Sequence, residues 1–172
     1  MRPLLLLAFI LLTNVCISQT DKKRTVTGSN YKIEYPASWR VDSSRNKGTE
    51  LIFYSPLDND EDKFSENVNI LIQNLKGRNI DLKKYKQITD GELAALGGDS
   101  KTHESSILKS GNTEYYRLVY EMTQDKRKLK FTSVCYIKNE KAYLLTFTAP
   151  LSTYDRYKNT GEDILNSFVL TK

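Results

Sequence analysis

Apolar and polar residues alternate along the stretch from Thr113 to Ala149, which is interrupted twice by short polar segments. Period-two alternation is typical of β-strands with one buried face. The pattern therefore predicts three consecutive strands joined by tight turns. The opposite face is also partly apolar, so the sheet needs cover on both sides. Each strand has one apolar face: Tyr116, Leu118, Tyr120 and Met122 in the first, Leu129, Phe131, Cys135 and Ile137 in the second, and Tyr143, Leu145, Phe147 and Ala149 in the third.

Shorter segments before this region also have strand character. The first ends at Pro36, because proline has no N–H group to donate to a strand ladder. The only tryptophan, Trp39, follows this proline and is expected to fill the core beneath the turn. The predicted upstream strands are residues 31–35, 39–41, 50–54, 67–75 and 102–109.

Two segments have the 3.6-residue period of amphipathic helices. The first, residues 81–96, starts at Asp81, whose carboxylate can accept from a free backbone N–H group. The second follows Pro150, with Ser152 as its expected N-cap and Gly161 on its apolar stripe, where a close approach to the sheet is expected. Two helices and a sheet that needs cover on both faces predict an α+β fold. We expect a three-layer α/β/α sandwich around a mostly antiparallel sheet of about six strands.

The first 18 residues have the layout of a secretory signal peptide. A basic residue precedes an apolar run over residues 4–12, and small side chains at Cys16 and Ser18 favour cleavage before Gln19. The apolar run is too short to span a bilayer. A lipoprotein acylated at Cys16 is the alternative, although a valine precedes that cysteine where a small residue is usual. We expect a secreted or periplasmic protein.

Cleavage leaves one domain with no transmembrane segment. The 172 residues minus these 18 leave 154, enough for a single core. Residues 19–30 are polar and predict a flexible leader, so order is expected over residues 31–172. The net charge of +5 is a mild excess, which does not favour a nucleic-acid-binding protein. Cys135 is the one cysteine left after cleavage, so no disulfide within the chain is expected.

Three short segments carry a resemblance to a known family. The opening 31–39, YKIEYPASW, resembles the F-x-I-x-Y-P-x-x-W start of the PsbP-like family. A strand, a Ser-Pro pair and the segment 64–70 follow in the family's order, and the segment 164–168 resembles the end of its last helix. The resemblance covers most of residues 31–170.

The resemblance implies a fold, an antiparallel sheet of about six strands between helices. The founding members of the family are lumenal subunits of photosystem II that help to retain calcium and chloride. Fold does not transfer function, and no residue here beyond the shared frame points to photosynthesis. The family offers no catalytic motif to map onto this chain.

The acidic loop at residues 58–66 is the nearest approach to a metal site. Asp58, Asp60 and Asp62 occupy positions 1, 3 and 5 of a calcium-loop pattern. Lys63 stands where the pattern needs glycine, and Asn69 stands where it needs a bidentate glutamate. A looser calcium site would use Glu66 together with the three aspartates. A solvated loop without metal is the favoured interpretation.

Catalytic groups are sparse. His103 is the only histidine, and Cys135 lies on a predicted apolar strand face, where a buried, inert thiol is the ordinary outcome. We therefore expect no enzyme and no cofactor other than the calcium alternative. The sequence predicts a non-enzymatic, exported accessory or binding module of the cell envelope. Its partner would be an unidentified envelope protein or a small ligand, with a small-ligand or calcium-binding module using residues 58–66 as the alternative function.

Overall fold

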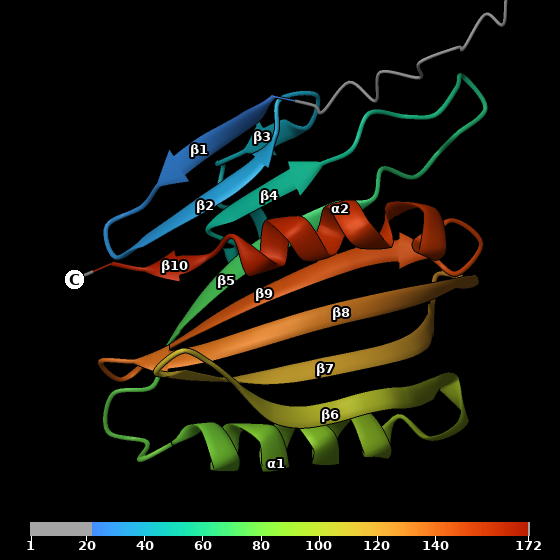
Figure 1. Cartoon of the computed structure of the whole chain (residues 1–172). Coiled ribbons are helices and arrows are strands. Elements are labelled where there is room, and N and C mark those ends of the chain that lie inside the picture. Colours follow the sequence, from blue (N-terminus) through green and yellow to red (C-terminus); the bar gives the residue numbers. More distant parts are fainter. Residues whose placement is uncertain (1–21, 172) are drawn as a thin grey trace, which may run out of the picture.

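The computed structural model describes residues 22–171, which form ten strands and two α-helices (Figure 1). Every strand pairing is antiparallel. The strands are β1 (Lys23–Thr27), β2 (Tyr31–Pro36), β3 (Arg40–Asp42), β4 (Leu51–Tyr54), β5 (Asn67–Asn74), β6 (Ser100–Ser110), β7 (Thr113–Gln124), β8 (Arg127–Lys138), β9 (Lys141–Pro150) and β10 (Val169–Leu170). The α-helices are α1 (Leu82–Ala95) and α2 (Tyr154–Asn166), and the 3-10 helices are η1 (Asn46–Gly48) and η2 (Gly97–Asp99).

The strands form two sheets. The large one has seven strands in the order β3-β4-β5-β9-β8-β7-β6, and the small one has three in the order β1-β2-β10. The predicted three-strand meander is β7–β8–β9, and it forms one half of the large sheet. Its turns place Asp125, Lys126, Asn139 and Glu140 at positive φ, which suits short hairpins between twisted strands.

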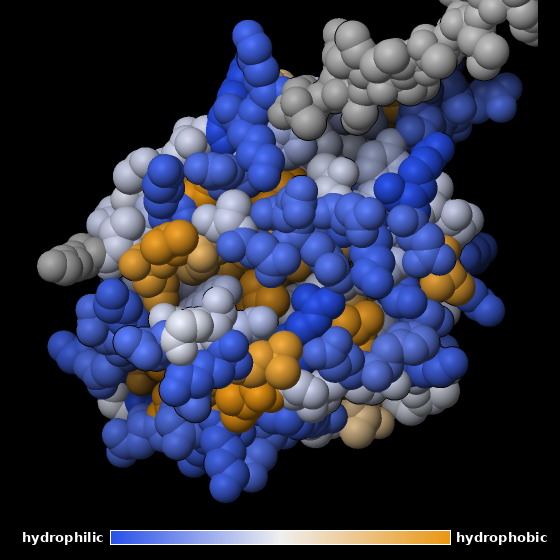
Figure 2. All heavy atoms as spheres, viewed as in Figure 1, coloured by the Kyte–Doolittle hydropathy of each residue, from blue (hydrophilic) through white to orange (hydrophobic). Residues whose placement is uncertain are grey.

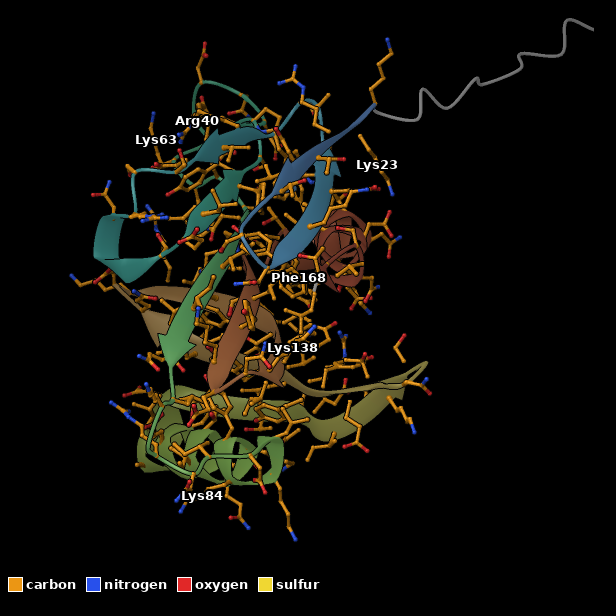
Figure 3. The ribbon with its side chains drawn as sticks, turned by 90° about the vertical axis from the view of Figure 1, so that its left-hand side faces the viewer. Lys23, Arg40, Lys63, Lys84, Lys138 and Phe168 are labelled. Carbon is orange, nitrogen blue, oxygen red and sulfur yellow. The ribbon has the colours of Figure 1, made fainter. Side chains whose placement is uncertain are left out.

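The two faces of the large sheet are covered by different elements. Helix α2 and the small sheet pack on one face, while α1 packs against β6, β7 and β8 on the other; Figure 3 shows the two helices on opposite sides. The core under α2 contains Tyr31, Ile33, Tyr35, Trp39, Leu51, Phe53, Val68, Ile70, Val134, Tyr143, Leu145, Phe147, Ala149, Tyr154, Ile164, Leu165 and Phe168. The core under α1 contains Leu75, Leu93, Tyr116, Leu118, Cys135 and Ala142.

Local chemistry explains how the helices start and pack. Asp81 is the N-cap of α1, as predicted, and accepts from the Lys84 N–H at 2.7 Å. The expected N-cap of α2, Ser152, is wrong: Thr153 occupies that position without a side-chain cap, because its hydroxyl donates to Glu66 instead. The prediction for Gly161 is confirmed, since a Cβ atom there would lie 2.5 Å from the Phe147 ring.

The α+β class and the mostly antiparallel sheet are confirmed, but three details differ from the prediction. The large sheet has seven strands rather than six, because the short β3 joins its edge. A second, small sheet shares the cover with α2, so one outer layer is not purely helical. Order begins before residue 31, since β1 pairs with β2 from Lys23 onward, and residues 23–27 are therefore not a flexible leader.

Within residues 22–171, no helix has both the length and the apolar character needed to cross a membrane. The predicted signal peptide, residues 1–18, its cleavage before Gln19 and the alternative acylation of Cys16 lie outside the described residues. These assignments therefore stay predictions.

Candidate binding groove

The acidic loop is tied to α2 through its first aspartate. Arg156 forms an ion pair with Asp58, and the Tyr157 hydroxyl donates to the other oxygen of the same carboxylate at 2.5 Å. Both partners come from the first turns of α2. The Asp58 carboxylate is therefore already engaged by a cation and a hydroxyl.

The other three predicted ligands point to separate partners. Asp62 accepts from the backbone N–H groups of Asp58 and Phe64, at 3.0 and 2.9 Å, which closes the loop on itself. Glu66 is 2% exposed and accepts from the hydroxyls of Ser55, at 3.0 Å, and Thr153, at 2.6 Å. The Asp60 side chain is exposed, whereas its carbonyl oxygen accepts from the Lys63 ammonium at 2.9 Å. Through these contacts the loop connects β4 and β5 to the start of α2.

The four carboxylates are not gathered around one point. Among residues 22–171, no three His, Cys, Asp or Glu side chains are placed to hold a metal ion together. Calcium binding by this loop would require Asp58 to leave Arg156 and Glu66 to leave its two hydroxyl partners. It stays a prediction, and calorimetry of the purified chain with calcium tests it.

The cysteine and the histidine lie on opposite faces of the large sheet. The Cys135 thiol is buried beneath α1, and this burial raises its pKa to about 12 although a hydrogen bond with Tyr85 opposes the shift. His103 bonds to Glu121 at 2.7 Å. Glu121 also pairs with Lys130, whose ammonium lies over the Tyr154 ring of α2, on the other face. The two side chains therefore do not form a nucleophile–base pair.

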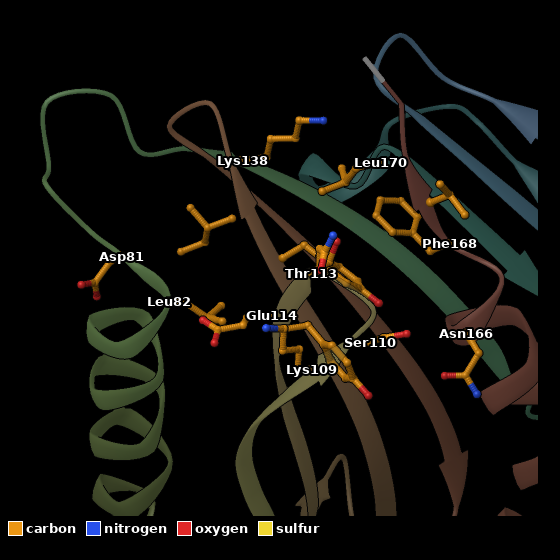
Figure 4. Close-up of a pocket in the computed structure, with 15 residues that line it drawn as sticks. Asp81, Leu82, Lys109, Ser110, Thr113, Glu114, Lys138, Asn166, Phe168 and Leu170 are labelled. Carbon is orange, nitrogen blue, oxygen red and sulfur yellow. The ribbon is translucent and has the colours of Figure 1, made fainter.

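An open groove of about 880 Å³ lies where the end of α2, β10 and the β6–β7 turn come together. Figure 4 shows Phe168 and Leu170 on one side, Asp81 and Leu82 of α1 on the other, and the β6–β7 turn between them. The groove has this position because α2 ends at Asn166 and leaves the ends of β7 and β8 uncovered. We call it the β10 groove. It is lined by Asp81, Leu82, Lys109, Ser110, Asn112, Thr113, Glu114, Tyr115, Tyr136, Ile137, Lys138, Asn166, Phe168, Val169 and Leu170.

Stacked aromatic rings line the inner wall of the β10 groove. Tyr115 lies against Tyr136 with ring centroids 5.5 Å apart, and Tyr136 stacks on Phe168 at 5.4 Å. Phe168 in turn stacks on Tyr31 of the small sheet at 5.5 Å. Burial, and to a smaller extent the nearby Tyr115, raises the pKa of Tyr136 above its ordinary value. The four rings therefore form a continuous wall in which each ring packs on the next.

The rim of the β10 groove combines apolar and charged groups. Val169 is 56% exposed. Leu108 is not a lining residue, but it pairs with the lining residue Tyr115 in the β6–β7 register and is 36% exposed beside the groove. Figure 2 shows hydrophobic side chains at the surface over β10 and near β6 and β7. Lys138 lies at the edge and donates to the Thr171 carbonyl oxygen at 3.2 Å. Exposed apolar side chains next to polar and charged ones are typical of binding surfaces.

Sequence reasoning did not find this groove. Its residues come from four separate parts of the chain, and β10 contains only Val169 and Leu170, too short to show a period. The aromatic residues at alternate positions of β7 and β8 were the available signal. They could be assigned to strand faces, but not to a gap in the cover.

Comparison with known proteins gives one family. The model of the PsbP family matches residues 22–170. A search of curated proteins found no match.

Several solved structures share the fold. Cyanobacterial PsbP from Synechocystis sp. PCC 6803 aligns with a TM-score of 0.62 and 14% identity, covering 92% of this chain and 98% of its own. LpqN of Mycobacterium tuberculosis, described as involved in cell envelope biogenesis, aligns at 0.61 and 16%, covering 88% and 91%. PA94 of Pseudomonas aeruginosa, a protein of unknown function described as a putative regulator, aligns at 0.61 and 12%, covering 86% and 96%. At these identities the likeness shows the fold alone.

Proposed function

Because this chain belongs to the PsbP family, we propose that it is an exported accessory module of the cell envelope that acts by binding rather than by catalysis. A structural neighbour, LpqN, is described as involved in cell envelope biogenesis, which is consistent with this setting. The family frame does not identify a partner. The kind of partner is inferred from the surface of this chain.

The observation that carries the proposal is the β10 groove. It combines an open volume of about 880 Å³, a continuous wall of packed aromatic rings and an exposed valine at its edge. Aromatic anchors next to exposed aliphatic side chains are characteristic of surfaces that bind another protein. We propose that the occupant is an extended segment of an envelope protein, which places an apolar side chain against Tyr136 and Phe168.

A binding role also fits the state of the nucleophile candidates. Cys135 is buried with a pKa of about 12, and a thiol in that state has almost no reactive thiolate at neutral pH. A broad hydrolase screen of the purified chain tests this part of the proposal. Reproducible turnover that disappears in Cys135→Ala or His103→Ala would show an enzyme.

Export is proposed from the sequence of residues 1–18, with cleavage before Gln19. Mass spectrometry of the exported protein tests it. A diacylglycerol on Cys16 would show the lipoprotein alternative instead.

Site-specific photocrosslinking tests the groove. The chain is produced in living cells with benzoylphenylalanine at position 169, and the cells are irradiated with ultraviolet light. The control chain carries the same group in place of Glu92, which lies on the exposed surface of α1. We expect a discrete cross-linked envelope protein from position 169 alone. A substitution of Leu108→Asp, which puts a carboxylate beside the aromatic wall, should remove that band. A band that forms equally from position 92, or that survives this substitution, would contradict the proposal.

A further inference from the structure

A second hollow, of about 850 Å³, lies on the face of the large sheet opposite α2. It crosses β4, β5, β9 and β8 in the part of that face that α1 does not cover, since α1 packs on β6, β7 and β8. Its volume falls within the range of about 300–1,000 Å³ typical of small-ligand pockets. We call it the trough and define it by Ile52, Tyr54, Phe64, Asn67, Asn69 and Thr148.

Strand register builds the floor of the trough in two rows. Residues directly opposite one another on neighbouring strands lie side by side on the same face. The first row, in strand order, is Tyr54, Asn67, Thr148 and Phe131. The second row is Ile52, Asn69, Thr146 and Ser133.

The centre of this floor is polar but carries no charge. The next row along the same face passes beneath α1 and is apolar, with Leu144 and Cys135 side by side in β9 and β8. The change from apolar to amide and hydroxyl side chains therefore coincides with the end of the helical cover. Two neighbouring asparagines on one strand are unfavourable for β-structure, so packing within the sheet does not account for them.

The asparagine carboxamides have hydrogen-bonding capacity to spare. Within residues 22–171, the Asn69 carboxamide has no protein partner, and that of Asn67 reaches only the Ser65 carbonyl oxygen, at 3.3 Å. Each carboxamide offers two donors and an acceptor. Behind them the hydroxyls of Ser133 and Thr146 bond to each other at 3.0 Å, which fixes the inner part of the floor.

Aromatic rings bracket the polar centre. Tyr54 and Phe64 are half-buried at the open side, and Phe131 closes the other side, stacked on Tyr120 with centroids 4.7 Å apart. A sugar ring presents hydroxyl groups that both donate and accept at its edge, and apolar C–H groups on its faces. Neutral amides can bond the hydroxyl groups of such a ring, and aromatic rings can contact its C–H faces. Binding would also leave no buried charge without a partner.

We propose that the trough binds a neutral saccharide of one to a few units. The Asn67 and Asn69 carboxamides would bond its hydroxyl groups. The Arg40 and Arg127 guanidinium groups lie over the Tyr54 and Phe64 rings, 4.5 and 5.8 Å from their centroids, so the sugar would contact the opposite side of each ring. The rim holds both signs of charge, with Asp42, Asp125 and Arg127 at different points, so an anionic or cationic glycan gains no uniform attraction. This proposal does not depend on the β10 groove.

Nitrogen-15 NMR of the whole mature chain tests the proposal. The probes are maltotriose, cellotriose and triacetylchitotriose, each titrated to about 20 mM at low and at high salt. We expect saturable shifts of the Asn67 and Asn69 side-chain resonances with at least one probe. Because the floor is uncharged, the affinity should be independent of salt.

Two variants make the test specific. Asn69→Leu keeps the side-chain size and should weaken binding at least about tenfold through lost hydrogen bonds. Asn159→Leu makes the same change on the exposed surface of α2 and should leave the affinity unchanged. Absence of saturable shifts with all three probes would overturn the proposal. So would shifts that map away from the trough, or an affinity that Asn69→Leu leaves intact; the wild-type map decides even if that variant fails to fold.

Discussion

The two faces of the large sheet are covered to very different extents. On the α2 face, adjacent strands present Phe53, Ile70, Leu145 and Phe147, each with 0% of its surface exposed, beneath a helix and a second sheet. On the α1 face a single helix covers one half, and Leu93 is its only buried residue among those described. The composition of each face follows its cover, apolar where the cover is complete and polar where it stops.

The difference explains where the two proposed binding sites lie. Both hollows lie where the cover of the sheet ends, the β10 groove past the end of α2 and the trough past the edge of α1. Some side chains at these borders, such as Tyr54 and Tyr136, are partly exposed, and the strands that carry them are paired on both sides. Substitutions on the two faces should therefore differ strongly in their effect on stability.

The largest expected contrast separates two neighbouring residues of β9 that point to opposite faces. Phe147→Ala opens a cavity under α2 and should lower the free energy of unfolding by about 3–5 kcal/mol. Thr148→Ala, on the floor of the trough, should lower it by less than about 1 kcal/mol. Urea unfolding followed by circular dichroism measures both. Equal losses of unfolding free energy would mean that the two faces are equally well packed.

A pair of helical glycines tests the same contrast through close approach. A Cβ at position 161 would meet the Phe147 ring at 2.5 Å, so Gly161→Ala should destabilise the chain by about 1–3 kcal/mol. Around position 91 in α1 there is open space, so Gly91→Ala should stabilise it by up to about 1 kcal/mol. Thermal unfolding compares the two variants. The contrast fails if both shift the midpoint in the same direction.

Acid should loosen the α1 face, because α1 is held partly by a carboxylate. Burial opposes ionisation of Asp90, but hydrogen bonds from Lys86, Ser105 and Tyr116 outweigh it and lower its pKa from the ordinary value. A lowered folded-state pKa stabilises the fold above the unfolded value and loses that contribution as pH falls through the folded one. We expect about 1 kcal/mol at neutral pH, since the side chain is partly exposed.

Unfolding between pH 6 and pH 2 measures this contribution. The stability of Asp90→Asn should be lower at pH 6 and should fall less on acidification than that of the unsubstituted chain. Asp163→Asn, at an exposed position of α2, serves as the matched control. An identical pH profile for Asp90→Asn and the unsubstituted chain would show that the carboxylate does not secure α1.

The smallest effect concerns reactivity rather than stability. Cys135 lies beneath α1 with a pKa of about 12, so iodoacetamide at pH 8 should leave it unmodified in the native chain and modify it fully in urea. Intact mass after a fixed reaction time reports both states. Rapid native modification would show that α1 opens readily.

The sequence predicts the parts of this fold that repeat with a period. The alternation from Thr113 to Ala149 defines β7–β9, and the glycine on the stripe of α2 identifies its contact with the sheet. The strand at residues 23–27 was not predicted, because a cluster of basic residues at one end of β1 hides its alternation. β10 was not predicted because two residues have no period.

The sites were harder to predict, because they depend on contacts between distant residues. The acidic loop has the spacing of a metal site, yet Asp58 pairs with Arg156 and Glu66 with Thr153, and local sequence shows neither pairing. Asn67 and Asn69 become the centre of a hollow only through the register of β5 with β9. Where the cover of a sheet ends is a property of the assembled fold.

Whether binding takes place where the cover of the sheet ends is tested most directly by comparing three chains in one crosslinking experiment. Each carries benzoylphenylalanine at position 169, and two carry either Leu108→Asp beside the groove or Asn69→Leu in the trough. We expect Leu108→Asp to remove the cross-linked envelope protein and Asn69→Leu to leave it intact. Retention of the band in all three chains would contradict this expectation.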